Sequence, residues 1–186
     1  MEKSGFDFGV SAFYFLRHGE TFESEVGIVQ GQNETELTAQ GRRTAERAAE
    51  KLSSVALGSI YSSPLKRTMM TASIVSLFTG APVHALPGLM ERNWGIYQGH
   101  PKSHRPSSAN PPTVESIEAF QSRVLAAMQS ITGPSPVLVV GHSGVFRIIC
   151  AHAGIAIKQW ASVANGEILL LSPSLIPGRA WHISMV

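Results

Sequence analysis

The segment Ala12–Thr21, which reads AFYFLRHGET, decides the fold of this sequence. Its first half, Ala12–Leu16, is apolar or aromatic without interruption, which is typical of a strand buried on both faces of a parallel sheet. The run ends abruptly at Arg17 and His18, so a guanidinium and an imidazole follow the carboxyl end of the predicted strand. Ligands bind at that end of the strands in open α/β sheets. We therefore expect a binding site beside these two residues.

Two further predicted strands end in residues that suit the same site. Pro136–Val140 (PVLVV) is the clearest buried strand and is followed by Gly141–Gly144 (GHSG). Ser59–Ser62 (SIYS) is followed by a predicted helix that carries an arginine in its first turn. Because the carboxyl ends of parallel strands meet at one edge of a sheet, four side chains are expected to converge there. They are Arg17, His18, Arg67 and His142.

The rest of the chain alternates between helix and strand. Ser63 and Pro64 predict the N-cap and first residue of a helix that ends near Gly80. Further helices are expected at 39–54, from Thr113 or Ser116, and at 145–153, and further strands at 83–86, 165–171 and 181–186. This alternation predicts one α/β domain over residues 1–186, with a mostly parallel sheet of about six strands. A short proline-rich excursion is expected at about 99–113.

Composition and charge exclude several classes of protein. The chain has 186 residues, of which 44% are hydrophobic and 15% charged, so it can bury a core. Fifteen basic against thirteen acidic residues give a net charge of +2, and no basic stripe for nucleic acid is evident. No apolar run reaches the length of a membrane span, and Met1–Ser11 lacks the apolar region of a signal peptide. We expect a cytoplasmic protein with no nucleic-acid or membrane partner.

The small numbers of aspartate and cysteine residues exclude further kinds of catalytic and metal site. Asp7 is the only aspartate, so an aspartyl-phosphate nucleophile, an EF-hand loop or a Walker-type site cannot be built inside the fold. Cys150 is the only cysteine, which excludes an internal disulfide and a paired-cysteine metal site. Ala156 stands where a Cys-x5-Arg phosphatase motif needs arginine. We therefore expect Cys150 to be a small core residue.

Five segments, which together span nearly the whole chain, resemble one family in their order. They are Phe15–Thr21 (FLRHGET), Leu37–Gly41 (LTAQG), Tyr61–Arg67 (YSSPLKR), Leu89–Gly95 (LMERNWG) with Gln98 and Gly99, and Val139–Arg147 (VVGHSGVFR). On these segments the protein resembles the histidine phosphatase superfamily, the phosphoglycerate mutase-like proteins. The resemblance implies a three-layer α/β/α sandwich around a six-stranded sheet with one antiparallel strand. We expect that strand in the segment after Asn165.

The resemblance also implies a role for each matching residue. His18 would be the nucleophile that becomes phosphohistidine, Arg17, Arg67 and His142 would surround the phosphoryl group, and Glu91 would donate the proton that the leaving alkoxide needs. The residue types suit these roles, because a neutral imidazole can attack phosphorus and preorganised donors stabilise the charge on the phosphoryl oxygens. The scheme needs no metal ion and no cofactor. The expected partner is a small-molecule phosphomonoester, and the oligomeric state stays open.

Other side chains near these motifs are additional candidates. Hydroxyls that can donate to phosphate are expected at Thr21, Ser24 and Ser143. The proline-rich excursion contains three basic side chains, which either meet a second acidic group of the substrate or belong to a solvated loop. These are Lys102, His104 and Arg105.

The sequence leaves three alternatives to a phosphatase. A mutase must exclude water from its phosphoenzyme, which usually needs a longer covering insertion than residues 99–113, so hydrolysis is favoured. A catalytically silent module that binds phosphorylated ligands is the second alternative. A serine hydrolase is the third, because Gly141–Val145 resembles a G-x-S-x-G elbow that lacks its final glycine. Its triad in chain order would be Ser143, Glu167 and His182.

Overall fold

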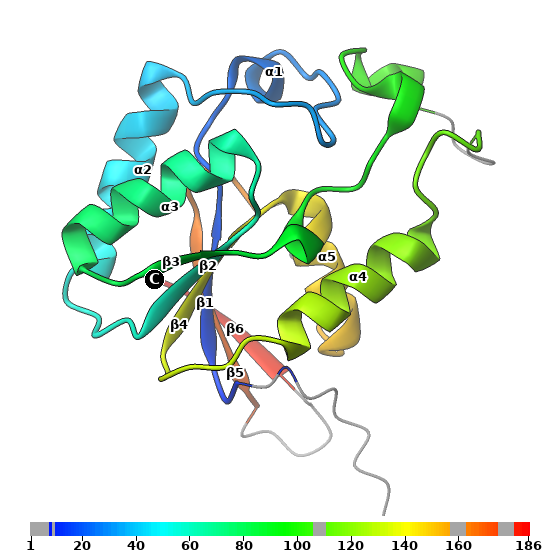
Figure 1. Cartoon of the computed structure of the whole chain (residues 1–186). Helices are drawn as coiled ribbons and strands as arrows, with labels where there is room; N and C mark the ends of the chain where they lie inside the picture. The colour runs from blue at the N-terminus through cyan, green and yellow to red at the C-terminus, as the bar shows by residue number, and fades with distance from the viewer. Residues whose placement is uncertain (1–7, 9, 106–110, 157–162, 175–180) are drawn as a thin grey trace, which may run out of the picture.

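A computed structural model describes residues 8, 10–105, 111–156, 163–174 and 181–186 (Figure 1). The described strands form one sheet in the order β3-β2-β4-β1-β5-β6. They are β1 Phe13–Arg17, β2 Ser59–Ser62, β3 Val83–Ala85, β4 Val137–Gly141, β5 Ile168–Pro173 and β6 Trp181–Met185. Strand β5 runs antiparallel to β1 and β6, whereas β1, β2, β3 and β4 pair in parallel. A mostly parallel six-stranded sheet with its antiparallel strand after Asn165 is thus confirmed.

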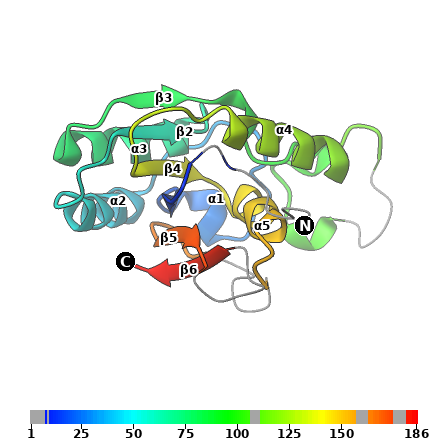
Figure 2. The same cartoon turned by 90° about the horizontal axis from the view of Figure 1, so that it is seen from below.

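Helices cover both faces of this sheet. Helices α2 (Ala39–Leu52) and α3 (Lys66–Thr79) lie on one face, and α4 (Ile117–Gln129) and α5 (Ser143–His152) lie on the other (Figure 2). The short helix α1 (Phe22–Glu25) and the 3-10 turns η1 (Pro87–Leu89), η2 (Gly95–Tyr97) and η3 (Lys102–His104) belong to the connections. The protein therefore has the predicted three-layer α/β/α architecture. Within the described residues no helix combines the length and apolar character that crossing a membrane requires.

The central strands β1 and β4 are apolar up to their carboxyl ends because both of their faces are covered. Phe13 and Phe15 pack in the core that includes α4 and α5, whereas Leu16 packs in the core that includes α2 and α3. Successive strand residues point to opposite faces, so a strand between two helical layers needs apolar residues at every position. The parallel register pairs Arg17 with Gly141. This register places the two motifs that follow β1 and β4 side by side.

The helix predicted to begin at Pro64 begins instead at Lys66, with Leu65 as its N-cap. The Ser63 hydroxyl still accepts the N–H of Leu65 at 3.4 Å, and it also lies 2.9 Å from Nε2 of His142. The N–H of Lys66 donates to the carboxylate of Glu34 at 2.8 Å, and this acidic side chain provides part of the capping. The predicted start of the helix was therefore wrong by two residues.

The helix that follows β4 also begins at a different residue from the predicted Val145. Helix α5 starts at Ser143, and His142 is its N-cap residue with extended backbone angles. The imidazole therefore sits at the junction between strand and helix. The N–H groups of the first helical turn are available to a partner outside the helix.

The described part of the proline-rich excursion is tied to the chain that follows α1. Pro101 forms a β-bridge with Ile28, and the N–H of Lys102 donates to the carbonyl of Gly27 at 2.9 Å. Val29 exchanges two backbone hydrogen bonds with this segment, one with His100 and one with Gly99. The predicted residues 106–110 of the excursion lie outside the described residues.

Candidate active site

A cavity of about 650 Å³ lies where β1 and β4 end and α3 and α5 begin. The predicted convergence of arginines and histidines is confirmed, because all four side chains line this cavity together with Glu91 and Ser143. Further lining residues come from the loops between Ile28 and Gly31 and between Glu91 and Arg105. The carboxyl edge of the sheet thus holds the predicted site.

His18 follows β1 and is buried, with 3% of its surface exposed. Its Nδ1 lies 2.8 Å from the carbonyl oxygen of Gly19. Because a carbonyl only accepts, we assign the proton to Nδ1 and the lone pair to Nε2. Burial and then the charges of Arg67 and Arg17 lower the pKa of His18 well below its usual value of 6.5. The ring is therefore neutral at neutral pH, as a nitrogen nucleophile has to be.

The turn that carries His18 packs directly on the start of α2. A Cβ atom on Gly41 would collide with the backbone of Glu20, and one on Gly19 would collide with the carbonyl of Gly41. Thr38 caps α2 by accepting the N–H of Gly41 at 2.9 Å and donates its hydroxyl to the carboxylate of Glu20 at 2.7 Å. The segments FLRHGET and LTAQG, which are separate in the sequence, are therefore in direct contact in the fold.

Arg17 and Arg67 are anchored by backbone carbonyls. Nη1 of Arg17 donates to Val163 at 2.6 Å, and the Nη atoms of Arg67 donate to Asn33 and Gly31 at 2.8 and 2.7 Å. The Nε atoms of both arginines are buried and bond to nothing in the described structure. Burial lowers the pKa of Arg67 to about 10, which leaves it charged at neutral pH. Such fixed guanidiniums suit a tetrahedral oxyanion.

His142 faces His18, with 5.2 Å between the ring centroids. Its Nδ1 lies 3.4 Å from an amino group of Arg67, and its Nε2 lies 2.9 Å from the hydroxyl of Ser63. An arginine only donates, so we assign the lone pair to Nδ1 and the proton to Nε2. Burial, followed by the charge of Arg67, lowers the pKa of His142 well below 6.5. Both histidines are thus neutral rings beside two cations.

Glu91 reaches the cavity from a segment without regular strand or helix. Its Oε2 accepts the N–H of Gly144 at 2.9 Å, and its Oε1 accepts the N–H of Arg92 at 2.8 Å. A Cβ atom on Gly144 would collide with the carboxylate, so only glycine leaves room for it at the start of α5. Two backbone N–H groups therefore hold the carboxylate of Glu91 at the cavity, so Glu91 is not a freely moving surface side chain.

Thr21 and Ser24, which were predicted to bind phosphate, do not line the cavity. Oγ1 of Thr21 accepts the N–H of Ser24 at 3.1 Å, and Oγ of Ser24 accepts the N–H of Thr21 at 3.0 Å. The two hydroxyls thus form a capping box at the start of α1. Both side chains are engaged by the backbone, which is why the structure does not bring them to the site. Ser143, in contrast, lines the cavity.

The cavity also contains further basic side chains, among them the two predicted candidates Lys102 and Arg105. Arg92 and Arg105 lie on the ring of Trp94, with 4.6 Å between each guanidinium carbon and the ring centroid. Arg147 and Lys102 line the same cavity. Arg147 lies one helical turn after Ser143 on α5, a spacing that could have indicated it. His104 does not line the cavity, and its ring lies 6.2 Å from that of His100.

The geometry gives no support to a serine hydrolase or a reactive thiol. In the described structure no hydrogen bond joins Ser143 to Glu167 or His182, and Glu167 bonds to Ala164 instead. Cys150 is buried in the core, and burial raises the pKa of its thiol to about 12. The described residues also contain no group of three or more histidine, cysteine, aspartate or glutamate side chains that could hold a metal ion.

Two arginines and two histidines at the carboxyl edge of an α/β sheet are suited to binding a phosphoryl group. The family model of the histidine phosphatase superfamily (branch 1) matches residues 13–173. The chain therefore belongs to this superfamily, as its motifs indicated.

Individual relatives agree with this assignment. The chain is 29% identical to phosphoglycerate mutase-like protein 4 of Arabidopsis thaliana, over 100% of this chain and 90% of that protein. It is 27% identical to the uncharacterized phosphatase PhoE of Bacillus subtilis, over 75% of this chain and 76% of that protein. The solved structure of YhfR from Bacillus stearothermophilus superimposes with a TM-score of 0.78 at 25% identity, over 95% of this chain and 96% of that one.

Proposed function

We propose that the protein is a metal-independent phosphatase that hydrolyses phosphomonoesters through a phosphohistidine at His18. The environment of His18 carries the proposal. Its Nδ1–H is held by a backbone carbonyl, its ring is neutral, and the side chains of Arg17 and Arg67 line the same cavity. A nucleophilic lone pair and donors for phosphoryl oxygens thus belong to one site.

In the first half-reaction, Nε2 of His18 attacks phosphorus in line with the ester oxygen. The N–P bond forms as the P–O bond breaks, and the electron pair of the broken bond leaves with the alcohol oxygen. Glu91, protonated, gives this oxygen its proton. The arginines stabilise the charge on the equatorial oxygens.

In the second half-reaction, Glu91 acts as the base. It takes a proton from a water molecule, whose oxygen attacks phosphorus while the N–P bond breaks and its electron pair returns to Nε2 of His18. The N–H groups of Gly144 and Arg92 suit this step, because they hold the carboxylate form. In the substrate complex the neighbouring dianion disfavours a second negative charge and so favours the protonated form. The products are an alcohol and orthophosphate.

We further propose that Lys102 and Arg105 bind a second acidic group of the substrate. Both line the cavity, and no carboxylate of the described residues forms an ion pair with either. Burial and then repulsion from Arg147 lower the pKa of Arg105, and burial and then repulsion from Arg17 lower that of Lys102. An acidic group would relieve this repulsion. The backbone ties to residues 27–29 favour a fixed wall over a solvated loop.

Hydrolysis is favoured over mutase transfer by the short connection between Gly99 and Thr113, which offers little chain to exclude water. The test is phosphate release from a panel of phosphomonoesters in excess EDTA, with His18→Ala as the comparison. Turnover that survives chelation and disappears in His18→Ala supports the proposal. Turnover that EDTA abolishes, or that His18→Ala retains, overturns it. Transfer between the positions of a phosphoglycerate without phosphate release would favour the mutase, and phosphate binding without turnover would favour the silent module.

A further inference from the structure

The segment that carries Glu91 has no strand or long helix of its own to fix it. Between β3 and α4 its described regular structure consists of the 3-10 turns η1, η2 and η3. A proton donor nevertheless has to be placed with sub-ångström accuracy, because a small misplacement of a reacting group costs much of the rate. Something outside the segment must therefore position Glu91.

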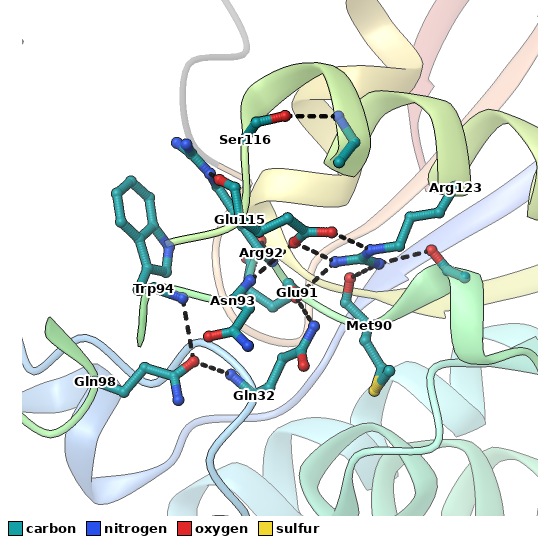
Figure 3. Close-up of polar contacts among 12 residues, drawn as sticks. Gln32, Met90, Glu91, Arg92, Asn93, Trp94, Gln98, Glu115, Ser116 and Arg123 are labelled. Atoms are coloured by element: carbon teal, nitrogen blue, oxygen red, sulfur yellow. Dashed lines mark hydrogen bonds and ion pairs between the residues drawn. The ribbon is translucent and has the colours of Figure 1, made fainter. Parts of the chain in front are cut away.

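The side chain of Arg123, on α4, makes the contacts that such a role requires (Figure 3). Its Nη1 donates to the carbonyls of Gly88 and Met90 at 2.9 and 2.7 Å, and its Nη2 donates to the carbonyl of Glu91 at 2.9 Å. Nε and Nη2 donate to the two carboxylate oxygens of Glu115 at 2.6 and 2.8 Å. All five N–H groups of one guanidinium are thus used, three of them on the backbone of this segment.

Glu115 completes the arrangement from the residue before the N-cap of α4. Its carboxylate accepts the N–H of Asn93 at 2.9 Å, and its backbone carbonyl accepts Nε of Arg92 at 2.8 Å. Arg123 and Glu115 therefore hold the chain on both sides of Glu91. A Cβ atom on Gly88 would collide with Ala127, so the segment also lies directly on α4.

We propose that Arg123 is a positioning residue for proton transfer by Glu91. It does not line the cavity, so it acts through the backbone of Glu91, whose carbonyl it shares with the side-chain amide of Gln32. The pair with Glu115 keeps the guanidinium in one orientation, because the planar fork matches both carboxylate oxygens. The inference rests on the proposed function, since it requires that Glu91 donates a proton to the leaving group.

The test compares two substrates that differ in their need for this proton. Glu91→Gln should slow an alkyl phosphate far more than p-nitrophenyl phosphate, because p-nitrophenolate hardly needs protonation. Arg123→Gln should show the same selectivity in kcat, with a loss of roughly tenfold or more for the alkyl phosphate and little for the nitrophenyl ester. In the Glu91→Gln background, Arg123→Gln should cause no further selective loss.

Two variants separate positioning from stability. Val124→Ala leaves a cavity in the buried face of α4, so it destabilises the fold but should not change the ratio of the two rates. The double variant Glu115→Gln/Arg123→Gln removes both charges and avoids a half-buried unpaired carboxylate, and it should reproduce the selectivity of Arg123→Gln.

Equal losses for both substrates in Arg123→Gln, or the same selectivity in Val124→Ala, would overturn the positioning role. If Glu91→Gln is selective and Arg123→Gln is not, the positioning role fails and the proposed phosphatase stands. If the wild-type protein releases no phosphate from either ester, both fail together.

Discussion

Two walls of the cavity are built in different ways. Arg17, His18, Arg67 and His142 form a strand wall, since each lies at the end of a buried strand or in the first turn of the helix that follows. Glu91, Trp94, Lys102 and Arg105 form a loop wall, which is held by side-chain hydrogen bonds, backbone bridges and the stacking on Trp94. The strand wall is thus fixed by the core, while single polar contacts fix the loop wall.

This difference predicts different consequences of substitution. A change in the strand wall removes an interaction with the phosphoryl group, which every substrate has in common. A change in the loop wall alters proton transfer or the contact with the rest of the substrate, so it should distinguish one substrate from another.

The largest effect is expected for Arg67→Lys in the strand wall. An ammonium cannot hold the carbonyls of Asn33 and Gly31 and still offer a donor to the phosphoryl group, so kcat/KM should fall by roughly 10²–10³-fold for all substrates alike. Lys66→Arg, at the neighbouring exposed ion pair with Glu36, is the matched control and should stay close to the wild type. Steady-state kinetics on an alkyl and an aryl phosphate measure both, and a strongly substrate-dependent loss would contradict the contrast.

A selective loss is expected for Gly144→Ala, where the added methyl group displaces the carboxylate of Glu91. Alkyl phosphates should lose roughly 10²-fold in kcat, close to the lower limit of general acid catalysis, and p-nitrophenyl phosphate should lose little. The exposed Ala151→Ser near the other end of α5 is the control. A wild-type ratio of the two rates in Gly144→Ala would show that Glu91 does not need its observed position.

A smaller effect is expected for Arg105→Gln, and it should depend on whether the substrate carries a second acidic group. KM should rise about tenfold for phenyl phosphates that carry a carboxylate, because a charged hydrogen bond is lost, and should be unchanged for phenyl phosphate itself. Arg43→Gln, an exposed arginine of α2 outside the cavity, serves as the control. Equal changes in KM for both substrates would exclude a subsite for a second acidic group.

The two histidines of the strand wall also predict how the stability of the fold depends on pH. Burial lowers the pKa of His18 and His142 well below 6.5, so the unfolded chain binds more protons than the folded one as the pH drops below that value. Their contribution to stability is complete above pH 6.5 and is lost progressively as the pH falls through the range below it. The free energy of unfolding, measured with urea at a series of pH values, should fall less steeply toward acidic pH in His142→Gln than in the wild type.

The smallest effect is expected for Thr21→Ala, outside both walls. Loss of the capping box should lower the free energy of unfolding by about 1 kcal/mol or less, because α1 is short. The KM for phosphomonoesters should not change, since the hydroxyl lies away from the cavity. An increase in KM with unchanged stability would restore Thr21 as a residue that binds phosphate.

The strand wall could be predicted from the sequence and the loop wall only in part. Continuous apolar runs mark β1 and β4, and residues that end parallel strands lie at one edge of the sheet, so the meeting of His18 and His142 could be expected without knowledge of any side-chain contact. The sequence did not identify Arg123 as a positioning residue, because an arginine on an amphipathic helix indicates only a solvent-exposed charge. Its partners Gly88, Met90 and Glu91 lie more than thirty residues away and offer only backbone carbonyls, which carry no sequence signal.

The hydrogen-bond partner of each of three hydroxyls likewise depended on the tertiary structure. Thr21, Ser24 and Ser63 were assigned from local patterns, as phosphate donors or as a helix cap. In the structure, Thr21 and Ser24 cap one another's backbone, and Ser63 bonds to His142. A hydroxyl both donates and accepts, so its partner depends on which group the fold brings within reach.

By itself, the sequence determined the α/β class and the residues of the strand wall, because hydrophobic periodicity is a local property. The superfamily and the antiparallel strand after Asn165 followed from the resemblance of its motifs to one family. Only the tertiary structure decided where Glu91 lies, which arginines keep an unpaired donor and how the segment before α4 is held. These features depend on distances between residues remote in sequence, and a hydrogen bond exists only when the fold brings donor and acceptor within reach.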